Sequence, residues 1–335
     1  MKKQILLTGA AGFIGSFVSR ELIRREYDVV GVDSLNVFYS TELKKMRLNG
    51  LRTLEGFRFL ELDVSSRASV DRLYEEFRFD GVIHLAAQAG VRLPLNRAHE
   101  YINNNVVGFH NILEMAVEKG VRNLLYASSS SVYGDECPLP YREASRGLQP
   151  KSFYGVTKLT NEFEASIYGS KSETSIRGLR FFTVYGPWGR PDMAYFRLMA
   201  SALGNHKFTL FGDGTIQRDF TYINDVSETT VDLLENLDSN SFRVNDLVNI
   251  GGMRPLSMQF LIELVESVSG KQLNITFDQP NANDSKITMA DNSYLTSLLG
   301  PRTFTPLESG IDKLRNWMSQ PNVKTRISDW IKSSN

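Results

Sequence analysis

The stretch Gln4-Ile5-Leu6-Leu7-Thr8-Gly9-Ala10-Ala11-Gly12-Phe13-Ile14-Gly15 stands near the start of the chain and decides its fold. The run up to Thr8 is mainly apolar, which is typical of a strand buried on both faces of a parallel sheet. Three glycines follow, then an amphipathic run to Arg25 and a second strand-like run at 28–33. The order strand, glycine turn, helix, strand predicts the first unit of a doubly wound α/β sheet.

The glycine turn and the end of the second strand together predict a dinucleotide site of the Rossmann type. Glycines let the backbone approach a pyrophosphate closely, and the N–H groups at the start of the next helix favour its negative charge. Asp33 ends the second strand, where its carboxylate can accept from both ribose hydroxyls. No arginine stands at 34–36 to hold a 2′-phosphate, so the pattern favours NAD over NADP. The residues expected around the pyrophosphate are Gly9, Gly12, Phe13, Ile14 and Gly15.

The ends of two later strands are also expected to contact the cofactor. Asp63, with Val64 beside it, can hold the adenine amine, although an ordinary loop aspartate fits the position as well. Leu85, Ala86 and Ala87 close the next strand, and small residues there let a cofactor lie against the backbone.

The remaining periodicity predicts a continuing parallel sheet and a second, smaller domain. Further strands are expected at 57–64, 81–87, 121–127 and 174–182, and helices at 101–119, 193–203, 224–236, 257–269 and 306–318. The chain is expected to leave the sheet after residue 182 and to return to it. We therefore predict an NAD-binding Rossmann domain of 1–182 plus about 222–252. A discontinuous α/β substrate domain of about 183–221 plus 253–335 completes the chain.

Composition narrows the class of partner. The 335 residues carry 38 Lys+Arg and 38 Asp+Glu, and a net charge of zero gives no support for nucleic acid or an anionic membrane as partner. Cys137 is the single cysteine, and the four histidines have no close metal-ligand spacing, so neither a disulfide nor a metal site is expected. His84 lies inside an apolar run and is interpreted as a core histidine. No run is long enough for a signal peptide core or a membrane span, which favours the cytoplasm.

A candidate reactive pair follows the fifth strand. Tyr154 and Lys158 are four residues apart, so on a helix both side chains project from one face. A lysine ammonium beside the phenol is expected to lower the pKa of the tyrosine and make it a base. Serines 128–131 stand at the carboxyl end of the strand, where doubly wound sheets bind ligands. A chance surface pair and a flexible serine loop are the alternatives.

This set of features resembles the extended short-chain dehydrogenase/reductases, the family of nucleotide-sugar epimerases and dehydratases. Within that family the sequence resembles the UDP-glucuronate 4-epimerases, and the family resemblance covers nearly the whole chain. The segments that carry it are 86–92, 128–134, 179–194 and 218–222.

The resemblance implies a set of site residues. Ser129, Tyr154 and Lys158 match the catalytic positions, Asn105 a substrate-facing asparagine, and Arg218 the arginine that holds the sugar-nucleotide diphosphate. Thr183 and Arg190 match residues that bind a sugar carboxylate. The full expected substrate set is Arg92, Asn105, Ser129, Ser130, Thr183, Arg190, Arg218 and Asp284. Two long helices, around 101–119 and 153–170, are expected to form a homodimer interface, unless their apolar faces pack only within the subunit.

The implied reaction is 4-epimerisation of a UDP-uronic acid through a 4-keto sugar, with NAD regenerated in each cycle. The related 4,6-dehydratases place Asp-Glu where Ser130 and Ser131 stand, and the decarboxylases place a glutamate in this loop. This chain has neither the acid–base pair nor the glutamate, which favours epimerisation over both reactions. The stretch 279–285 also lacks the Gly-Asp-Val that is usual in such epimerases. Three alternatives stay open: an epimerase of a neutral UDP-hexose, an NDP-sugar dehydratase or decarboxylase, and a non-catalytic module that senses NAD or a nucleotide.

Overall fold

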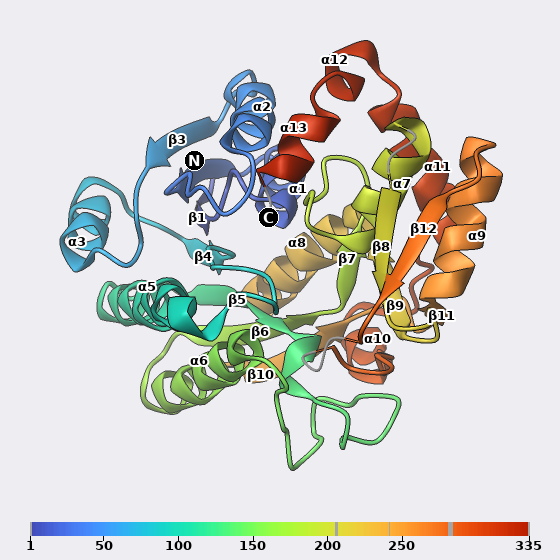
Figure 1. Cartoon of the computed structure of the whole chain (residues 1–335). Coiled ribbons are helices and arrows are strands. Elements are labelled where there is room, and N and C mark those ends of the chain that lie inside the picture. The colour runs from blue at the N-terminus through green and yellow to red at the C-terminus, as the bar shows by residue number, and fades with distance from the viewer. Residues whose placement is uncertain (1, 205–206, 241, 281–283, 334–335) are drawn as a thin grey trace.

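The computed structural model describes residues 2–204, 207–240, 242–280 and 284–333. Across these residues a seven-stranded sheet with strand order β3-β2-β1-β4-β5-β6-β10 forms the centre of the molecule (Figure 1). Every neighbouring pair in it is parallel. Its strands are β1 (Gln4–Thr8), β2 (Asp28–Asp33), β3 (Phe57–Glu61), β4 (Gly81–His84), β5 (Asn123–Ser129), β6 (Ser175–Phe181) and β10 (Asn245–Ile250). The prediction of a doubly wound Rossmann sheet is confirmed.

Both faces of the sheet are buried, as the apolar runs predict. Along β1, Ile5 and Leu7 belong to the hydrophobic core on one face, and Leu6 belongs to the core on the other. Helices α1 (Phe13–Arg24), α2 (Thr41–Arg52) and α8 (Ile223–Ser239) contribute to the first core. Helices α3 (Arg67–Glu76), α5 (Gly108–Glu118) and α6 (Phe153–Lys171) cover the second face, with α5 and α6 side by side (Figure 1).

The smaller part of the fold carries two short sheets. One consists of β7 (Thr183–Tyr185), β9 (Gln217–Tyr222) and β11 (Pro255–Ser257), and the other of β8 (Lys207–Phe211) and β12 (Asn274–Asp278). Helices α7 (Ala194–Gly204), α9 (Met258–Ser269) and α11 (Leu307–Met318) pack against them on the right of Figure 1. Short helices α10 (Ser293–Leu299), α12 (Pro321–Lys324) and α13 (Ile327–Lys332) complete the chain. The two-domain division stays a prediction.

Several boundaries differ from those expected. The strands expected to reach residues 64 and 87 end at Glu61 and His84, whereas β5 runs on to Ser129. The helix expected over 101–119 is three segments: α4 (Ala98–Tyr101), a π-helical segment (Ile102–Val107) and α5. A π turn widens the helix by one residue and often marks a functional site. Here it contains Asn105, whose amide bonds outside the helix.

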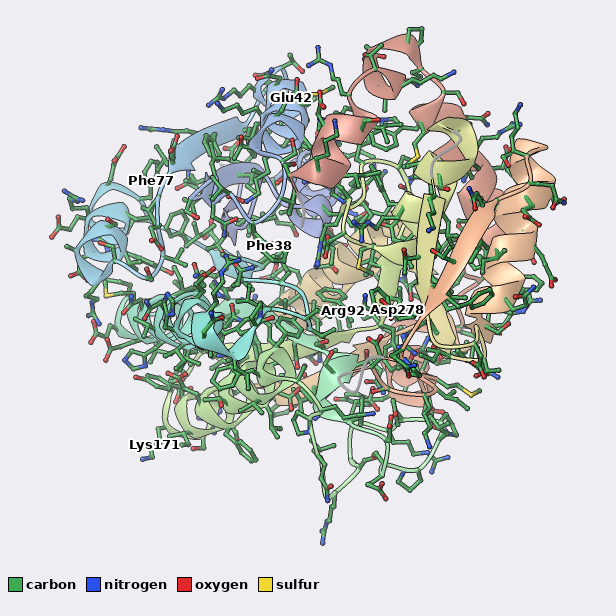
Figure 2. All side chains as sticks on the ribbon, viewed as in Figure 1. Phe38, Glu42, Phe77, Arg92, Lys171 and Asp278 are labelled. Atoms are coloured by element: carbon green, nitrogen blue, oxygen red, sulfur yellow. The ribbon has the colours of Figure 1, made fainter. Side chains whose placement is uncertain are left out.

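Helices α2 and α3 were not anticipated from the sequence, although each begins with a readable cap. The side chain of Ser40 accepts from the N–H of Leu43, and Ser66 accepts from Ser69 in the same way. In α2, the Glu42 carboxylate contacts the C-terminal helix α13, where it accepts from the indole of Trp330 (Figure 2). Helix α2, in the N-terminal part of the chain, is therefore linked to the C-terminal helix α13. No helix in the described ranges is long and apolar enough to cross a membrane.

His84 is a core histidine, as interpreted from the sequence. Its Nδ1 lies 2.9 Å from Thr8 Oγ1, and that oxygen already accepts from the N–H groups of Leu85 and Ala86. The Thr8 hydroxyl therefore donates to Nδ1, which assigns the neutral Nε2–H tautomer to His84. Burial, followed by the nearby charge of Lys158, lowers the pKa of His84 to about 3.

This buried neutral histidine predicts a loss of stability in acid. The unfolded chain takes up a proton at His84 below pH 6.5 and the folded chain does not, so the free energy of unfolding falls as pH drops through that value. We expect His84 to account for about 2 kcal/mol of the difference in unfolding free energy between pH 7 and pH 5. Denaturant titrations at pH 7 and pH 5 should give a difference in unfolding free energy that is smaller by this amount in His84→Asn than in the wild type. The same substitution at the exposed His99 should leave this difference unchanged. Equal differences in the two variants would contradict the assignment.

Candidate active site

A cavity of about 650 Å³ opens at the carboxyl ends of the central strands, between the large sheet and the two small ones. This is the edge at which doubly wound sheets bind ligands. Its lining draws on segments far apart in the sequence, including the glycine turn, the end of β2, the loop after β4, the end of β5, the start of α6 and the chain from β7 onward. Of the predicted site residues, all but Asn105 line it.

The glycine turn has the geometry that a dinucleotide requires. Gly9 has φ +74°, and a Cβ added there would lie 2.8 Å from the backbone of Leu85 and Ala86. At Gly15 a Cβ would lie 2.1 Å from the carbonyl oxygen of Gly9. Gly12 is the N-cap of α1 and offers no side-chain cap, so the first N–H groups of the helix face the site without an internal partner from the cap. These residues fit a pyrophosphate.

The ribose and adenine end of the cavity contains both an anticipated residue and one that was missed. Asp33 lines the cavity, and its two oxygens accept from the N–H groups of Ala11 and Leu35. Asp63 also lines it and accepts from Ser65. Lys44, on α2, brings its ammonium into the lining, where it donates to Asn36. Positions 34–36 carry no cation, and the positive charge at this end of the cavity comes instead from Lys44 on the following helix.

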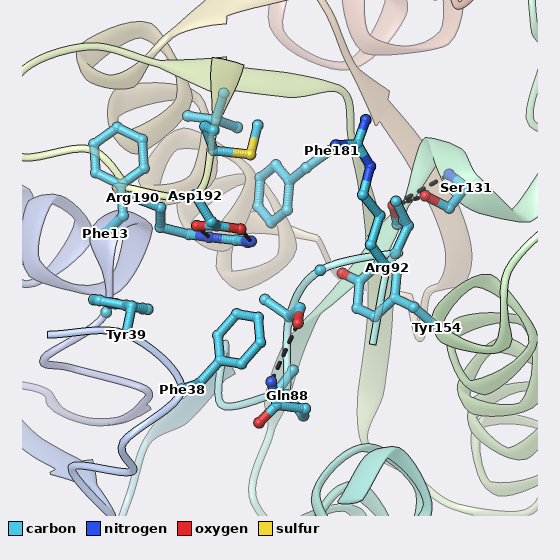
Figure 3. Close-up of a pocket in the computed structure, with 18 of the residues that line it drawn as sticks. Phe13, Phe38, Tyr39, Gln88, Arg92, Ser131, Tyr154, Phe181, Arg190 and Asp192 are labelled. Atoms are coloured by element: carbon cyan, nitrogen blue, oxygen red, sulfur yellow. Dashed lines mark hydrogen bonds and ion pairs between the residues drawn. The ribbon is translucent and has the colours of Figure 1, made fainter. Parts of the chain in front are cut away.

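The candidate reactive groups lie where β5 ends and α6 begins. The Ser129 hydroxyl, 9% exposed, lies 3.1 Å from Ser131 Oγ and accepts from the N–H of Ser131. Ser152 caps α6 by accepting from Gly155 N–H, so the helix starts with Tyr154 in its first turn and facing the cavity (Figure 3). The serines are ordered by the strand end and a short 3-10 turn (Ser130–Val132), not part of a flexible loop.

The expected effect of Lys158 on Tyr154 was wrong in this structure. Burial raises the pKa of Tyr154, and the two influences that lower it are the charge of Arg190 and a hydrogen bond with Ser129. The Lys158 ammonium lies 5.8 Å from the centre of the tyrosine ring and donates to the carbonyl of Ala127 at 2.9 Å. Burial lowers the pKa of Lys158 itself to about 8, against the opposing charge of Glu162. Arg190, and not Lys158, is therefore the cation whose charge lowers the pKa of the Tyr154 phenol.

A buried ion pair lies behind these groups. Arg180 on β6 and Glu162 on α6 make two hydrogen bonds of 2.8 Å, with side chains 2% and 5% exposed. The Ser128 hydroxyl donates to the same carboxylate, and the Arg180 guanidinium lies 4.7 Å over the ring of Tyr133. Because Glu162 is one turn after Lys158 on α6, the pair fixes this helix against the ends of β5 and β6.

Asn105 does not face the cavity, contrary to its predicted role at the substrate. Its side-chain oxygen accepts from Gln88 N–H at 2.7 Å, and its amide donates to the Gln88 carbonyl and to Thr157 Oγ1. Thr157 in turn donates to the carbonyl of Tyr154. Both N–H donors of the Asn105 amide are thus used within the wall, where the side chain ties the loop after β4 to the first turn of α6.

Thr183 and Arg190 both line the cavity, and Arg190 has a partner that was not anticipated. Its Nε donates to Asp192 Oδ1 at 3.0 Å, and Nη2 donates to Oδ2, which forms a two-point pair (Figure 3). The guanidinium also lies 6.0 Å from the ring centre of Phe38. Asp192 fixes the plane of Arg190. Burial lowers the pKa of Arg190, but the charge and hydrogen bonds of Asp192 raise it, and the net shift is upward. The short spacing Arg-x-Asp was the available sequence signal.

A second cationic group stands at the far end of the cavity. Asp284 accepts from Arg92 at 2.7 Å and lies 3.8 Å from Arg218, which also donates to the carbonyl of Ser285. Lys151 donates to the backbone oxygen of Asp284, and the Arg92 guanidinium lies 4.9 Å from the ring centre of Phe211. Lys151 also pairs with the Asp135 carboxylate at 2.7 Å. Three cations with two carboxylates leave a net positive charge that favours a diphosphate. Of the loop expected at 279–285, residues 281–283 lie outside the described part of the chain.

Comparison with known proteins agrees with this arrangement. The sequence pattern of the NAD dependent epimerase/dehydratase family matches residues 5–251. The chain belongs to this family. Its members depend on NAD, the glycine turn and Asp33 fit that cofactor, and NAD is the cofactor of this chain. At this level it is an NAD-dependent nucleotide-sugar epimerase/dehydratase.

The similar proteins include epimerases of both acidic and neutral sugars. The chain is 37% identical to a UDP-glucuronate 4-epimerase of Thermodesulfobacterium geofontis over 95% of this chain and 97% of that one. It also resembles the crystal structure of a Bacillus cereus UDP-glucuronic acid 4-epimerase in complex with UDP-glucuronic acid and NAD. The comparison with this structure gives a TM-score of 0.86 at 34% sequence identity, over 95% of this chain and 99% of the other. A Thermotoga maritima UDP-glucose 4-epimerase with UDP-glucose gives 0.84 at 26% identity, over 94% and 98%.

Tyr154 is placed to exchange a proton with a ligand in the cavity, and its hydroxyl is expected to be essential for turnover. Tyr154→Phe should lower kcat by ~10²–10⁴, because general acid–base catalysis contributes about that much. The measurement is steady-state turnover with circular dichroism as a check on folding. Tyr168→Phe makes the same change about four turns along α6, outside the cavity lining, and should retain activity. Near-normal turnover of Tyr154→Phe would exclude Tyr154 as the base.

Proposed function

We propose that this protein interconverts UDP-glucuronate and UDP-galacturonate by NAD-dependent 4-epimerisation. The observation that carries the proposal is that Thr183 and Arg190 share one cavity with Ser129 and Tyr154. A hydroxyl and a guanidinium near the proton-transfer groups are suited to a carboxylate one carbon away from the reacting centre. The similarity to two UDP-glucuronate 4-epimerases supports the same substrate.

In the proposed mechanism, Tyr154 accepts the proton of the sugar 4-hydroxyl and Ser129 donates to the oxygen on carbon 4. Arg190 favours the phenolate electrostatically. Lys158 stays anchored to the Ala127 carbonyl and directs its remaining donors to the nicotinamide ribose. The chemistry that NAD supplies when bound is hydride removal at carbon 4 and its return. Arg92 and Arg218 would bind the diphosphate while the sugar turns between them and Tyr154, and Tyr154 then returns its proton to the oxygen on carbon 4.

The proposed substrate makes carboxylate orientation important. A 4-keto sugar with a carboxylate on carbon 5 is a β-keto acid, which loses carbon dioxide when the carbon–carboxylate bond aligns with the carbonyl π system. Thr183 and Arg190 protect the intermediate by holding the carboxylate out of this alignment. The Asp192 pair supports such a role because it fixes the guanidinium in one plane.

A neutral UDP-hexose is the second candidate substrate, and one observation favours it. Asp192 already compensates the charge of Arg190, which reduces the attraction that Arg190 exerts on an anionic sugar. Incubation with UDP-glucuronate and, separately, with UDP-glucose, followed by chromatographic identification of the products, decides between the two. Galacturonate product from the first and little galactose from the second is the expected result. Conversion of UDP-glucose alone would reject the uronate proposal, and no turnover of either would favour a sensing module.

Loss of the carboxylate contacts is expected to divert the intermediate to decarboxylation. Thr183→Val and Arg190→Ala should raise the ratio of UDP-pentose to epimer above that of the wild type, because the carbon–carboxylate bond becomes free to move into alignment with the carbonyl π system. Mass spectrometry of the products measures the ratio directly. Thr53→Val, at an exposed position at the end of α2, is the matched control. An unchanged ratio in both site variants would remove the protective role.

We further propose that the protein is a homodimer that associates through α6. Val156, Phe163 and Ile167 are 46%, 64% and 56% exposed and lie at helical spacing along one face of that helix. A neighbouring stretch of the π-helical segment adds exposed Ile102 and Val107. A continuous apolar face of this kind on a surface helix is typical of a self-association site. Sedimentation equilibrium should give twice the mass of the chain, and a monomer at micromolar concentration would contradict the proposal.

A further inference from the structure

Arg47 on α2 uses every donor of its guanidinium inside the protein. Its Nη1 donates to the Ala11 carbonyl at 3.1 Å and to the Tyr39 hydroxyl at 2.7 Å. Its Nε donates to the Trp188 carbonyl at 3.1 Å, and Nη2 donates to the carbonyls of Trp188 and Gly189 at 2.5 and 3.1 Å. These five bonds match the five N–H donors of arginine. Arg47 is 2% exposed and is not part of the cavity lining.

The acceptors of Arg47 belong to the two halves of the candidate site. Ala11 lies in the glycine turn, and its N–H donates to Asp33. Trp188 and Gly189 directly precede Arg190, and Trp188 has φ +62°, in the region that side chains other than glycine rarely adopt. A single guanidinium therefore bridges the turn that holds the pyrophosphate and the loop that holds Arg190. It also contributes positive charge behind the turn, because all its hydrogen-bond acceptors are neutral oxygens.

The same loop leads into a cluster of tryptophans. Trp188 lies 5.1 Å from Trp317 on α11, and Trp317 stacks on Trp330 of α13 with ring centres 6.1 Å apart. The Trp330 indole donates to Glu42, one turn before Arg47 on α2. The path from α2 through the loop, α11 and α13 therefore returns to α2. These are the three tryptophans of the chain, and none of them lines the cavity.

We propose that Arg47 is a positioning residue that couples the dinucleotide turn to the loop carrying Arg190, so that NAD bound at the turn sets the conformation of that loop. Ordering of the Ala11 carbonyl by the pyrophosphate fixes the Nη1 side of the guanidinium. The planar, delocalised group transmits that constraint to the two carbonyls on its Nη2 side. Lysine keeps the charge but concentrates its donors on one nitrogen, which cannot span both segments.

The test compares Arg47→Lys with Arg52→Lys, which makes the same change at an exposed position of the same helix. NAD is removed, and binding is then followed by calorimetry and by tryptophan emission. In the wild type and in Arg52→Lys, saturation with NAD should change the emission, because all three tryptophans lie along the coupled path. Arg47→Lys should bind NAD about tenfold more weakly and show little emission change at saturation.

Three results would overturn the proposal. The first is a wild-type emission spectrum that NAD leaves unchanged, which needs no variant and therefore decides the question even where Arg47→Lys does not fold. The second is an Arg47→Lys protein with normal NAD affinity. The third is weaker affinity with the full emission change, because Arg47 would then serve the turn alone.

A product assay extends the inference to catalysis and rests on the proposed function. At saturating NAD, Arg47→Lys should raise the ratio of UDP-pentose to epimer by several-fold, since a loosened loop no longer holds Arg190 against the carboxylate. An unchanged ratio in a folded, NAD-saturated variant would show that the coupling does not reach Arg190. Failure of the wild type to act on UDP-glucuronate would reject the proposed function, whereas the emission experiment would still decide the coupling.

Discussion

The buried pair of Arg180 and Glu162 is the interaction on which the geometry of the site depends. Two charges with so little exposure persist only when hydrogen bonds satisfy them, and here a two-point contact and the Ser128 hydroxyl do so. The pair joins β6 to α6 and, through Ser128, to the end of β5. Removal of either partner would leave an unpaired charge beneath α6, a change that typically costs about 3–5 kcal/mol. The contribution of the pair lies in fixing Tyr154 and Lys158 relative to the serines, because a buried ion pair adds little net stability by itself.

Electrostatics at Tyr154 differ from the simple pairing with lysine that the spacing suggests. Burial opposes the phenolate, and Arg190, from the other side of the cavity, is the main charge that favours it. The residue proposed to hold the substrate carboxylate thus also acts on Tyr154, the proposed base. A bound carboxylate would offset part of this positive charge and change the basicity of Tyr154. Asp192 limits that change, because it already compensates Arg190 in the free protein.

The sequence was sufficient for the features that depend on local pattern. Buried strands, the glycine turn and Asp33 at the end of β2 follow from periodicity and spacing within short segments and lie where they were predicted. Spacing also predicted Tyr154 and Lys158 on one helix, but the pKa effect expected between them was wrong. The unanticipated features are long-range contacts. Lys44 reaches the ribose end from the following helix, and Arg47 meets carbonyls 141 positions later in the chain. The role of Asn105 was mispredicted because an asparagine suits a substrate contact and a structural contact within the cavity wall equally well. Only the register of the π-helical segment directs its side chain to Gln88.

The proposed specificity therefore depends on how the second half of the site is held as well as on single ligand contacts. Thr183 extends from a short strand paired with Phe220, so the small sheet restrains it. Arg190 follows a turn with a left-handed Trp188, and its position is restrained by the pair with Asp192 and by the carbonyls that Arg47 binds in the preceding residues. A related chain could keep both residues and still lose control of a β-keto acid if these restraints were relaxed. Comparison of sugar specificity within the family should thus include the residues behind the cavity wall as well as those that line it.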